Sequence, residues 1–191
     1  TWAFVIGKFL TDPIWWFYLY WLGLFLNKNY GLSLNELGLP LIVIYTMTCV
    51  GSVGGGWLSS AMIRQGGTVN SSRKRAMLVC AVLVVPVVSA AKMTNMWLAV
   101  LLIGLAAAAH QGWSANIFTT VSDMFPKKAV GSVTGLGGLA GSVGGMILMA
   151  SAGHIVQKTG SYLPLFIICG SAYLLALAIF QALAPRMDPV R

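Results

Sequence analysis

The chain has 191 residues, of which 58% are hydrophobic and 8% are charged, and its formal net charge is +8 at pH 7. Soluble domains usually carry about 25% charged residues. This composition therefore excludes an ordinary soluble domain, a disordered segment and a nucleic-acid-binding module. The three cysteines, Cys49, Cys80 and Cys169, fall in apolar stretches without metal-ligand spacing, so we expect small core residues and neither a disulfide framework, a metal nor a cofactor.

Six stretches follow one another as candidate membrane-spanning helices, which need about 20 apolar residues each. Five of them contain no Lys, Arg, Asp or Glu in their central part, while the first is interrupted by Lys8 and Asp12. We therefore predict an all-α membrane protein made of one six-helix transmembrane bundle over residues 1–191. The predicted spans are about 2–26, 38–63, 76–92, 96–121, 129–156 and 162–184, with a cytoplasmic loop at 64–75.

The basic residues are distributed unevenly between the two sides of this predicted bundle. The side with both termini and the loop 64–75 has eight Lys and Arg residues, whereas the other has only Lys28, Lys92 and Lys158. Because cytoplasmic loops are enriched in Lys and Arg, we expect both termini to be cytoplasmic. The positive charge is then a topology signal that requires no nucleic acid. The eight residues are Arg64, Arg73, Lys74, Arg75, Lys127, Lys128, Arg186 and Arg191.

The first span combines an ionisable pair with a cluster of aromatic residues. Lys8 and Asp12 are four residues apart, so they share a helix face and can pair. The pair is either structural or has a role in gating or coupling, because ionisable groups inside a span usually face the bundle interior or a water-filled cavity. Trp15 and Tyr18 lie on one face and suit a sugar, although packing or interfacial aromatics are the alternative.

Glycines are concentrated in the second and fifth spans. Gly131/Gly135, Gly137/Gly141 and Gly141/Gly145 form G-x-x-x-G pairs, and such pairs let helix backbones approach one another closely. Two interpretations remain open for these glycines. They provide either tight static packing or a surface on which helices slide or rock.

The fourth span becomes polar from His110 onward. His110, Trp113, Asn116 and Thr120 follow helical spacing, so we expect them on one face. Each polar group needs a partner in lipid, so this face is either an interhelical hydrogen-bond network or a cavity wall for a polar substrate. In the second case the Asn116 amide suits hydroxyl recognition. His110 is either a hydrogen-bonded structural residue or a proton relay.

The segment that joins the second and third spans resembles the cytoplasmic loop signature of the major facilitator superfamily. That signature connects the second and third helices of each six-helix half. Ser59 and Ser60 stand where the family normally has an aspartate. The residues that carry the resemblance are Gly56, Arg64, Gly67, Arg73 and Lys74.

Residues 8–21, 55–60 and 109–126 together resemble the C-terminal half of hexuronate transporters, in the anion:cation symporter branch of the superfamily. The resemblance covers essentially the whole chain. It implies half of a secondary transporter in a bacterial inner membrane, working by proton-coupled symport of a small anionic sugar acid and alternating access. The implied partners are the lipid bilayer and an N-terminal six-helix half, which holds most of the groups that bind the anion and carry protons.

The same resemblance implies which side chains line the C-terminal wall of the cavity and hold sugar hydroxyls. Because one half supplies one wall, we expect that these residues alone do not transport. The implied cavity residues are Trp15, Tyr18, Tyr45, His110, Gln111, Trp113, Asn116 and Thr120.

Two other classes of protein have a similar composition. A self-standing six-helix channel or membrane helper subunit without coupled transport is one, although the sequence contains no selectivity-filter motif. A membrane-embedded enzyme that acts on lipid is the other. We do not expect an enzyme, because the sequence contains no nucleophile elbow, no zinc-protease motif, no P-loop and no paired carboxylates.

Overall fold

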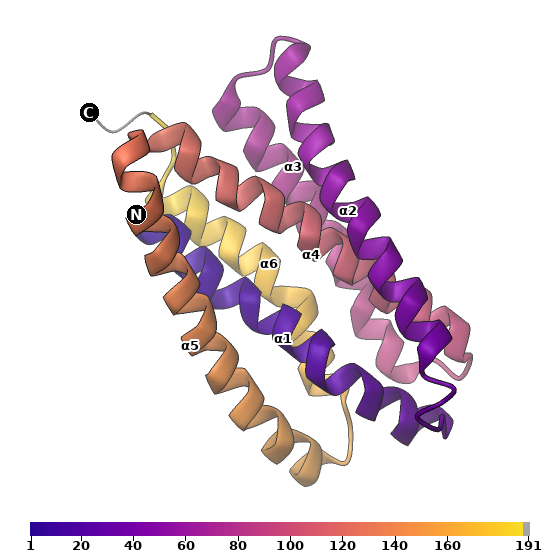
Figure 1. The fold of residues 1–191 in the computed structure, drawn as a ribbon. Coiled ribbons are helices and arrows are strands. Elements are labelled where there is room, and N and C mark those ends of the chain that lie inside the picture. Colours follow the sequence, from indigo (N-terminus) through magenta and orange to yellow (C-terminus); the bar gives the residue numbers. More distant parts are fainter. Residues whose placement is uncertain (189–191) are drawn as a thin grey trace.

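The computed structural model describes residues 1–188 and confirms the prediction of an all-α chain (Figure 1). It contains six α-helices and one 3-10 helix. In chain order these are α1 (Trp2–Tyr30), α2 (Gly38–Arg64), α3 (Val69–Val84), η1 (Val85–Lys92), α4 (Met96–Met124), α5 (Lys127–Thr159) and α6 (Leu163–Leu183). Arg191, which belongs to the predicted basic side, lies outside the described residues.

Five helical segments among these residues are long and apolar enough to cross a membrane: α2, α3 together with η1, α4, α5 and α6. The helix α1 is not among them, because its Trp and Tyr rings and its ion pair lower its hydropathy. Its 29 residues nevertheless give it sufficient length, since a helix rises about 1.5 Å per residue and the hydrocarbon core is about 30 Å thick. Six crossings therefore remain a prediction.

The connection between α2 and α3 is shorter than the predicted loop 64–75. Helix α3 begins at Val69, where the Thr68 hydroxyl accepts a hydrogen bond from the backbone N–H of Ser71. Residues 69–75 of the predicted loop are thus helical, because hydropathy marks where charges begin and not where a helix begins. The 3-10 helix η1 begins at Val85, with Pro86 in its first turn, where a residue without a backbone donor is tolerated.

The helices form two layers (Figure 1). In the front layer α2 packs on α4, α4 on α1, and α1 on α5. Behind them, α3 and η1 pack on α4, while α6 packs on α1, α3 and η1. Helix α4 therefore lies at the centre of the packing, and the front layer presents one side that no other described helix covers.

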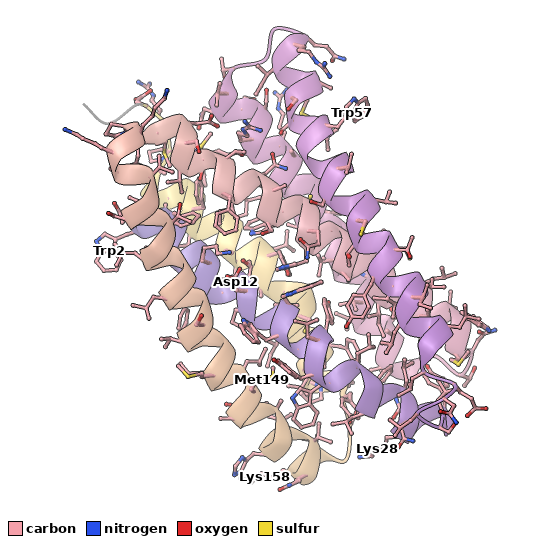
Figure 2. The ribbon with its side chains drawn as sticks, in the orientation of Figure 1. Trp2, Asp12, Lys28, Trp57, Met149 and Lys158 are labelled. Carbon is pink, nitrogen blue, oxygen red and sulfur yellow. The ribbon has the colours of Figure 1, made fainter. Side chains whose placement is uncertain are left out.

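The basic segments gather at one end of the bundle, as the loop count predicts. Lys74 of α3 contacts Ala184 after α6, and Arg73 pairs with Asp123 near the end of α4. Figure 2 shows Lys28 and Lys158 at the opposite end. The two sides inferred from the loops are thus separated in space.

Glycines bring the backbone of α2 into contact with the backbone of α4. A Cβ atom at Gly51 would overlap the backbone of Ala108, and one at Gly55 would overlap Gly112. At Gly54, on another face of α2, an added Cβ would have nothing within 4 Å. Small residues permit this approach between membrane helices, where the hydrophobic effect supplies no drive for association.

The glycines of α5 fall into two groups. Gly137, Gly141 and Gly145 leave room for side chains of α1, and Gly141 accommodates the carboxylate of Asp12. This first group supports the interpretation of tight packing. The second group faces open space, because no described atom lies within 4 Å of an added Cβ. Its members are Gly131, Gly135 and Gly138.

We predict that Gly51→Ala lowers the melting temperature of the purified protein and that Gly54→Ala does not. Overpacking against the Ala108 backbone costs about 1–3 kcal/mol. At the open position 54 the methyl group instead adds about 0.5–1 kcal/mol of helix stability. Thermal unfolding of both variants in one detergent measures the difference. Equal melting temperatures would contradict the close contact of α2 with α4.

Candidate functional site

Three aromatic side chains meet where α1, α2 and α4 come together. The Trp15 indole stacks on the His110 imidazole, with ring centroids 5.4 Å apart and an interplanar angle of 7°. The Tyr45 ring stands edge-on to Trp15 at 6.3 Å. Trp15 and Tyr45 are half-buried, whereas His110 is 4% exposed. Trp15 therefore covers the imidazole and keeps part of its own surface accessible.

The His110 ring is held from behind by α6. Its Nδ1 atom lies 2.5 Å from the Tyr173 hydroxyl, and the Tyr173 ring packs edge-on against Trp113 at 5.5 Å. This contact supplies the partner that a hydrogen-bonded structural histidine requires. Sequence reasoning missed Tyr173, because the residue lies on another helix within an otherwise apolar segment.

The structure buries five of the eight residues predicted to line a cavity. Trp113, Asn116 and Thr120 are 0% exposed, Tyr18 is 1% exposed and His110 is 4% exposed. The predicted common face of α4 exists, but it packs against neighbouring helices. Helical spacing defines a face without showing what covers it. In this conformation neighbouring helices cover these side chains, and their contact with a substrate stays a prediction.

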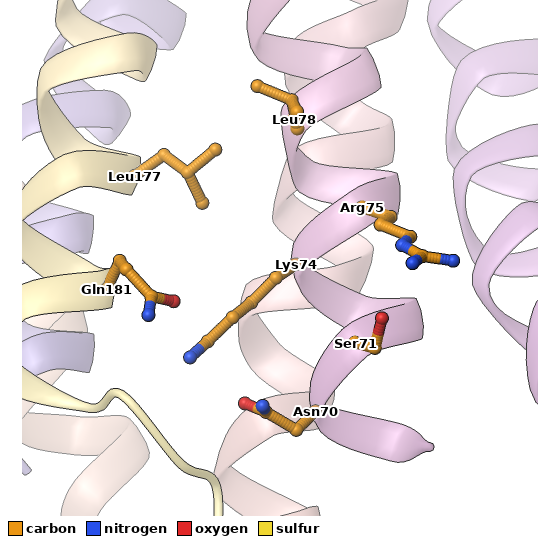
Figure 3. A pocket seen from close by; sticks show the side chains of 7 residues that line it. All are labelled: Asn70, Ser71, Lys74, Arg75, Leu78, Leu177 and Gln181. Carbon is orange, nitrogen blue, oxygen red and sulfur yellow. The ribbon is translucent and has the colours of Figure 1, made fainter. Parts of the chain in front are cut away.

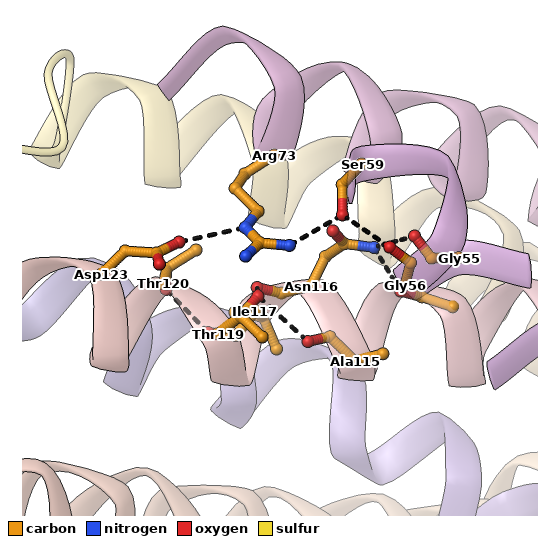
Figure 4. Close-up of polar contacts among 11 residues, drawn as sticks. Gly55, Gly56, Ser59, Arg73, Ala115, Asn116, Ile117, Thr119, Thr120 and Asp123 are labelled. Carbon is orange, nitrogen blue, oxygen red and sulfur yellow. Dashed lines mark hydrogen bonds and ion pairs between the residues drawn. The ribbon is translucent and has the colours of Figure 1, made fainter. Parts of the chain in front are cut away.

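Asn116 joins α4 to α2 (Figure 4). Its Nδ2 group donates hydrogen bonds to the carbonyl oxygens of Gly55 and Gly112, both at 2.9 Å. Gly55 is also where the α2 backbone approaches α4, so the amide bonds across the contact that the glycines open. Thr120 donates to the Ile117 carbonyl of its own helix at 2.7 Å. The bond from Asn116 to Gly55 is interhelical, as the network interpretation predicts, whereas Thr120 bonds within α4. The buried Oδ1 atom of Asn116 has no hydrogen-bond partner among the described residues.

The accessible side of α4 adjoins this buried face, because each accessible residue follows a buried one by one or two positions in the sequence. Gln111 and Ser114 are half-buried, and Phe118 is 37% exposed. Gln111 is a predicted site residue, whereas Phe118 is apolar and carries no signal in the sequence. The Nζ atom of Lys8 on α1 lies 3.9 Å from the centroid of the Phe118 ring.

Two contacts therefore repeat along the antiparallel helices α1 and α4. The first contact joins Lys8 to Phe118. The second joins Trp15, which follows Lys8 by seven residues on α1, to His110, which precedes Phe118 by eight residues on α4. We call these four residues, together with Gln111, the α1–α4 seam. The seam runs along the middle of the front layer.

Lys8 and Asp12 form the ion pair that their spacing allows, with 2.8 Å between Nζ and Oδ2. The Lys8 side chain is 5% exposed and the Asp12 side chain 20% exposed. Asp12 fits against Gly141 of α5, and Figure 2 shows it between α1 and α5. The pair thus occupies the interior of the front layer, where it contacts α4 on one side and α5 on the other.

A second charged cluster lies at the basic end of the bundle (Figure 4). Arg73 donates through Nε to Asp123 Oδ2 at 3.0 Å and through Nη1 to Ser59 Oγ at 2.8 Å. Arg73 on α3 therefore ties α4 and α2 together. Ser59, which replaces the usual aspartate of the loop signature, accepts this hydrogen bond as a neutral residue.

The remaining residues of the loop signature have separate positions. Lys74 donates to the carbonyl oxygens of Ala184 at 2.6 Å and Pro185 at 2.9 Å. Arg64 is exposed at the end of α2, and the Gly56 carbonyl accepts the Ser59 hydroxyl at 3.2 Å. At Gly67 a Cβ atom would approach Ser72 Oγ to 2.6 Å, so the tight turn requires glycine there.

Long apolar helices that enclose an ion pair and a polar aromatic seam are typical of membrane transport proteins. The match over residues 4–191 shows that the chain belongs to the Major Facilitator Superfamily. This finding confirms the superfamily predicted from the loop signature.

Curated relatives of the chain are sugar-acid transporters. The hexuronate transporter of Escherichia coli K12 is 28% identical over 184 residues, which are 95% of this chain and 42% of the relative. The D-galactonate transporter of E. coli O6:H1 is 24% identical over 179 residues, or 94% and 40% of the two chains. A probable galactarate/D-glucarate transporter of E. coli K12 is 25% identical over 174 residues, or 91% and 39%. The chain thus spans 39–42% of the length of these relatives.

We predict that Asn116→Ala lowers the melting temperature of the purified protein. The substitution removes two buried hydrogen bonds, which together contribute about 1–3 kcal/mol. Thr119→Ala is the matched control, because the Thr119 hydroxyl bonds to carbonyl groups of its own helix. Thermal unfolding of both variants in one detergent measures the difference. Equal melting temperatures of the two variants would contradict a packing role for the Asn116 amide.

Proposed function

We propose that this chain is one six-helix half of a proton-coupled sugar-acid symporter. In this proposal the chain works with an N-terminal six-helix half in a bacterial inner membrane, and both of its termini are cytoplasmic. Membership of the superfamily, the names of the sugar-acid relatives and the 39–42% span of their lengths support it. The uneven distribution of basic residues supports the orientation.

The observation that carries the proposal is the accessible part of the α1–α4 seam. Trp15 and Gln111, with Tyr45 beside them, are half-buried on the side of the front layer that no described helix covers. An aromatic ring covers the C–H face of a sugar. The Gln111 amide both donates and accepts hydrogen bonds, as hydroxyl groups require.

This seam is suited to the neutral part of a sugar acid. Lys8 is its cation, but Lys8 is 4% exposed and already paired with Asp12. A substrate carboxylate therefore needs a cation from elsewhere, and the proposal assigns that role to the N-terminal half. A substrate that is bound partly by each half also fits alternating access, in which one bundle rocks against the other.

The flanking helices of the front layer offer the surfaces for this second half and for lipid. Val53 and Trp57 of α2 are 75% and 62% exposed, and Leu139 and Met146 of α5 are both 64% exposed. Figure 2 shows Trp57 pointing away from the bundle. Exposed apolar surface of this extent indicates burial against membrane or protein.

We predict that Trp15→Ala weakens galacturonate uptake by the full-length natural protein. Loss of an aromatic contact removes about 0.5–1.5 kcal/mol, which corresponds to a roughly 2- to 12-fold lower affinity. Trp15→Phe keeps a ring and should have a smaller effect. The matched control is Trp57→Ala, since Trp57 is 62% exposed on α2.

Radiolabelled uptake into cells, normalised to the amount of protein in the membrane, tests this function. Equal effects of the Trp15 and Trp57 substitutions would contradict a binding role for the seam. Uptake that equilibrates but never accumulates substrate against a gradient would identify a channel instead. Uptake that is insensitive to a protonophore would contradict proton coupling.

The ion pair allows a separate prediction about coupling. Lys8→Met alone leaves Asp12 without its partner, and breaking a buried pair costs about 3–5 kcal/mol. The double variant Lys8→Met/Asp12→Asn removes both charges and should recover most of the lost melting temperature. In the proposed function the recovered protein binds galacturonate but no longer accumulates it. Normal accumulation by the double variant would identify a purely structural pair.

A further inference from the structure

A cavity of 350 Å³ opens between α3 and α6 at the basic end of the bundle (Figure 3). It lies in the back layer, away from the α1–α4 seam. One part of its lining is polar or basic, and the other part is apolar. The polar part comes from Asn70, Lys74, Arg75 and Gln181, and the apolar part from Leu78 and Leu177.

The cavity lies where an exposed apolar surface ends. Leu78 is 46% exposed, Val82, one helical turn further along α3, is 53% exposed, and Leu175 of α6 is 53% exposed. Toward the end of the bundle the side chains become basic within one turn, at Lys74 and Arg75. Such a change from apolar to basic surface is typical of the interface between the hydrocarbon core and the headgroup layer.

The positive charge at this cavity is not neutralised within the described part of the chain. Arg73 is paired with Asp123, but neither Lys74 nor Arg75 has an acidic partner among residues 1–188. Lys74 extends from α3 toward α6 (Figure 3). Carbonyl oxygens of Ala184 and Pro185 accept two of its three N–H groups, so the ammonium is fixed in position.

Two further features suit a headgroup that carries a phosphate and a hydroxyl group. The cavity adjoins the first turns of α3, and the positive end of a helix dipole stabilises negative charge there. The Asn70 side chain lines the cavity, and its buried Oδ1 atom has no hydrogen-bond partner among the described residues. A headgroup hydroxyl is a suitable donor for this oxygen.

We propose that this cavity binds the headgroup of an anionic phospholipid. The phosphate lies near Lys74 and Arg75, and an acyl chain runs along Leu78 and Leu177. A soluble anion would satisfy the basic part but leave the leucines uncovered, whereas a lipid matches both parts. Basic pockets between membrane helices are known to hold anionic headgroups. The inference requires only that the protein lies in a membrane and does not depend on the transported substrate.

The bound lipid also has a structural consequence. Lys74 already connects the start of α3 with the chain just after α6. A phosphate near the same ammonium adds a contact between the two helices on the lipid-facing side. Anionic lipid should therefore stabilise the packing of α3 on α6.

The test is a titration of the full-length natural protein with dioleoylphosphatidylglycerol, followed by native mass spectrometry. Arg75→Gln should weaken lipid binding about 5-fold, because one basic residue near a membrane surface contributes about 1 kcal/mol. Lys128→Gln is the matched control, since this exposed lysine lies at the same end, in the first turn of α5. It should leave binding unchanged.

A second variant tests the cavity without altering its charge. Leu78→Trp fills the apolar part and should also weaken binding, and its melting temperature shows whether the protein folds. Equal weakening by Arg75→Gln and Lys128→Gln would overturn the proposal in favour of diffuse attraction. Equal binding of dioleoylphosphatidylcholine, or displacement of the lipid by inorganic phosphate, would also overturn it. Galacturonate uptake is a separate measurement, so failure of the proposed transport function leaves this result interpretable.

Discussion

Backbone contact between helices is the constraint on which the front layer depends. Lipid tails are as apolar as leucine side chains, so membrane helices associate through close packing and interhelical hydrogen bonds. At Gly55 the backbone of α2 approaches α4 until an added Cβ would overlap Gly112, and the Asn116 amide then reaches the Gly55 carbonyl. At Gly141 the same absence of a side chain gives the Asp12 carboxylate its place. Glycine thus makes room for both of these polar contacts.

The sequence predicted the helices and the local pairs better than it predicted their surroundings. Spacing along one helix was sufficient to predict the contact between Lys8 and Asp12, which form their ion pair. Spacing also placed Trp113 and Asn116 on one face of α4, yet it did not show that this face is covered. Which residues are accessible depends on distant helices, as the contact of His110 with Tyr173 illustrates. Such information is absent from the local pattern of a single helix.

The front layer contains two pairs of closely packed helices, α2 with α4 and α1 with α5. Arg73 fastens α2, α3 and α4 together at the basic end, while α1 and α5 pack on each other along the glycines of α5. Helix α6 contacts both pairs, through its packing on α1 and the hydrogen bond between Tyr173 and His110. The two pairs meet at the α1–α4 seam, where Trp15 stacks on His110, so the accessible residues lie at the boundary between them.

The spacing of Lys8 and Asp12 also affects α1 during synthesis, before the rest of the bundle is made. Helix α1 leaves the ribosome before α4 and α5, which later place Phe118 and Gly141 against the pair. During that interval α1 has neither of these neighbours to shield its charges. A lysine and an aspartate four residues apart meet within an isolated helix, so α1 alone already carries no net charge at this position. If α1 crosses the membrane, as the sequence predicts, the pair lowers the cost of insertion before its permanent neighbours exist.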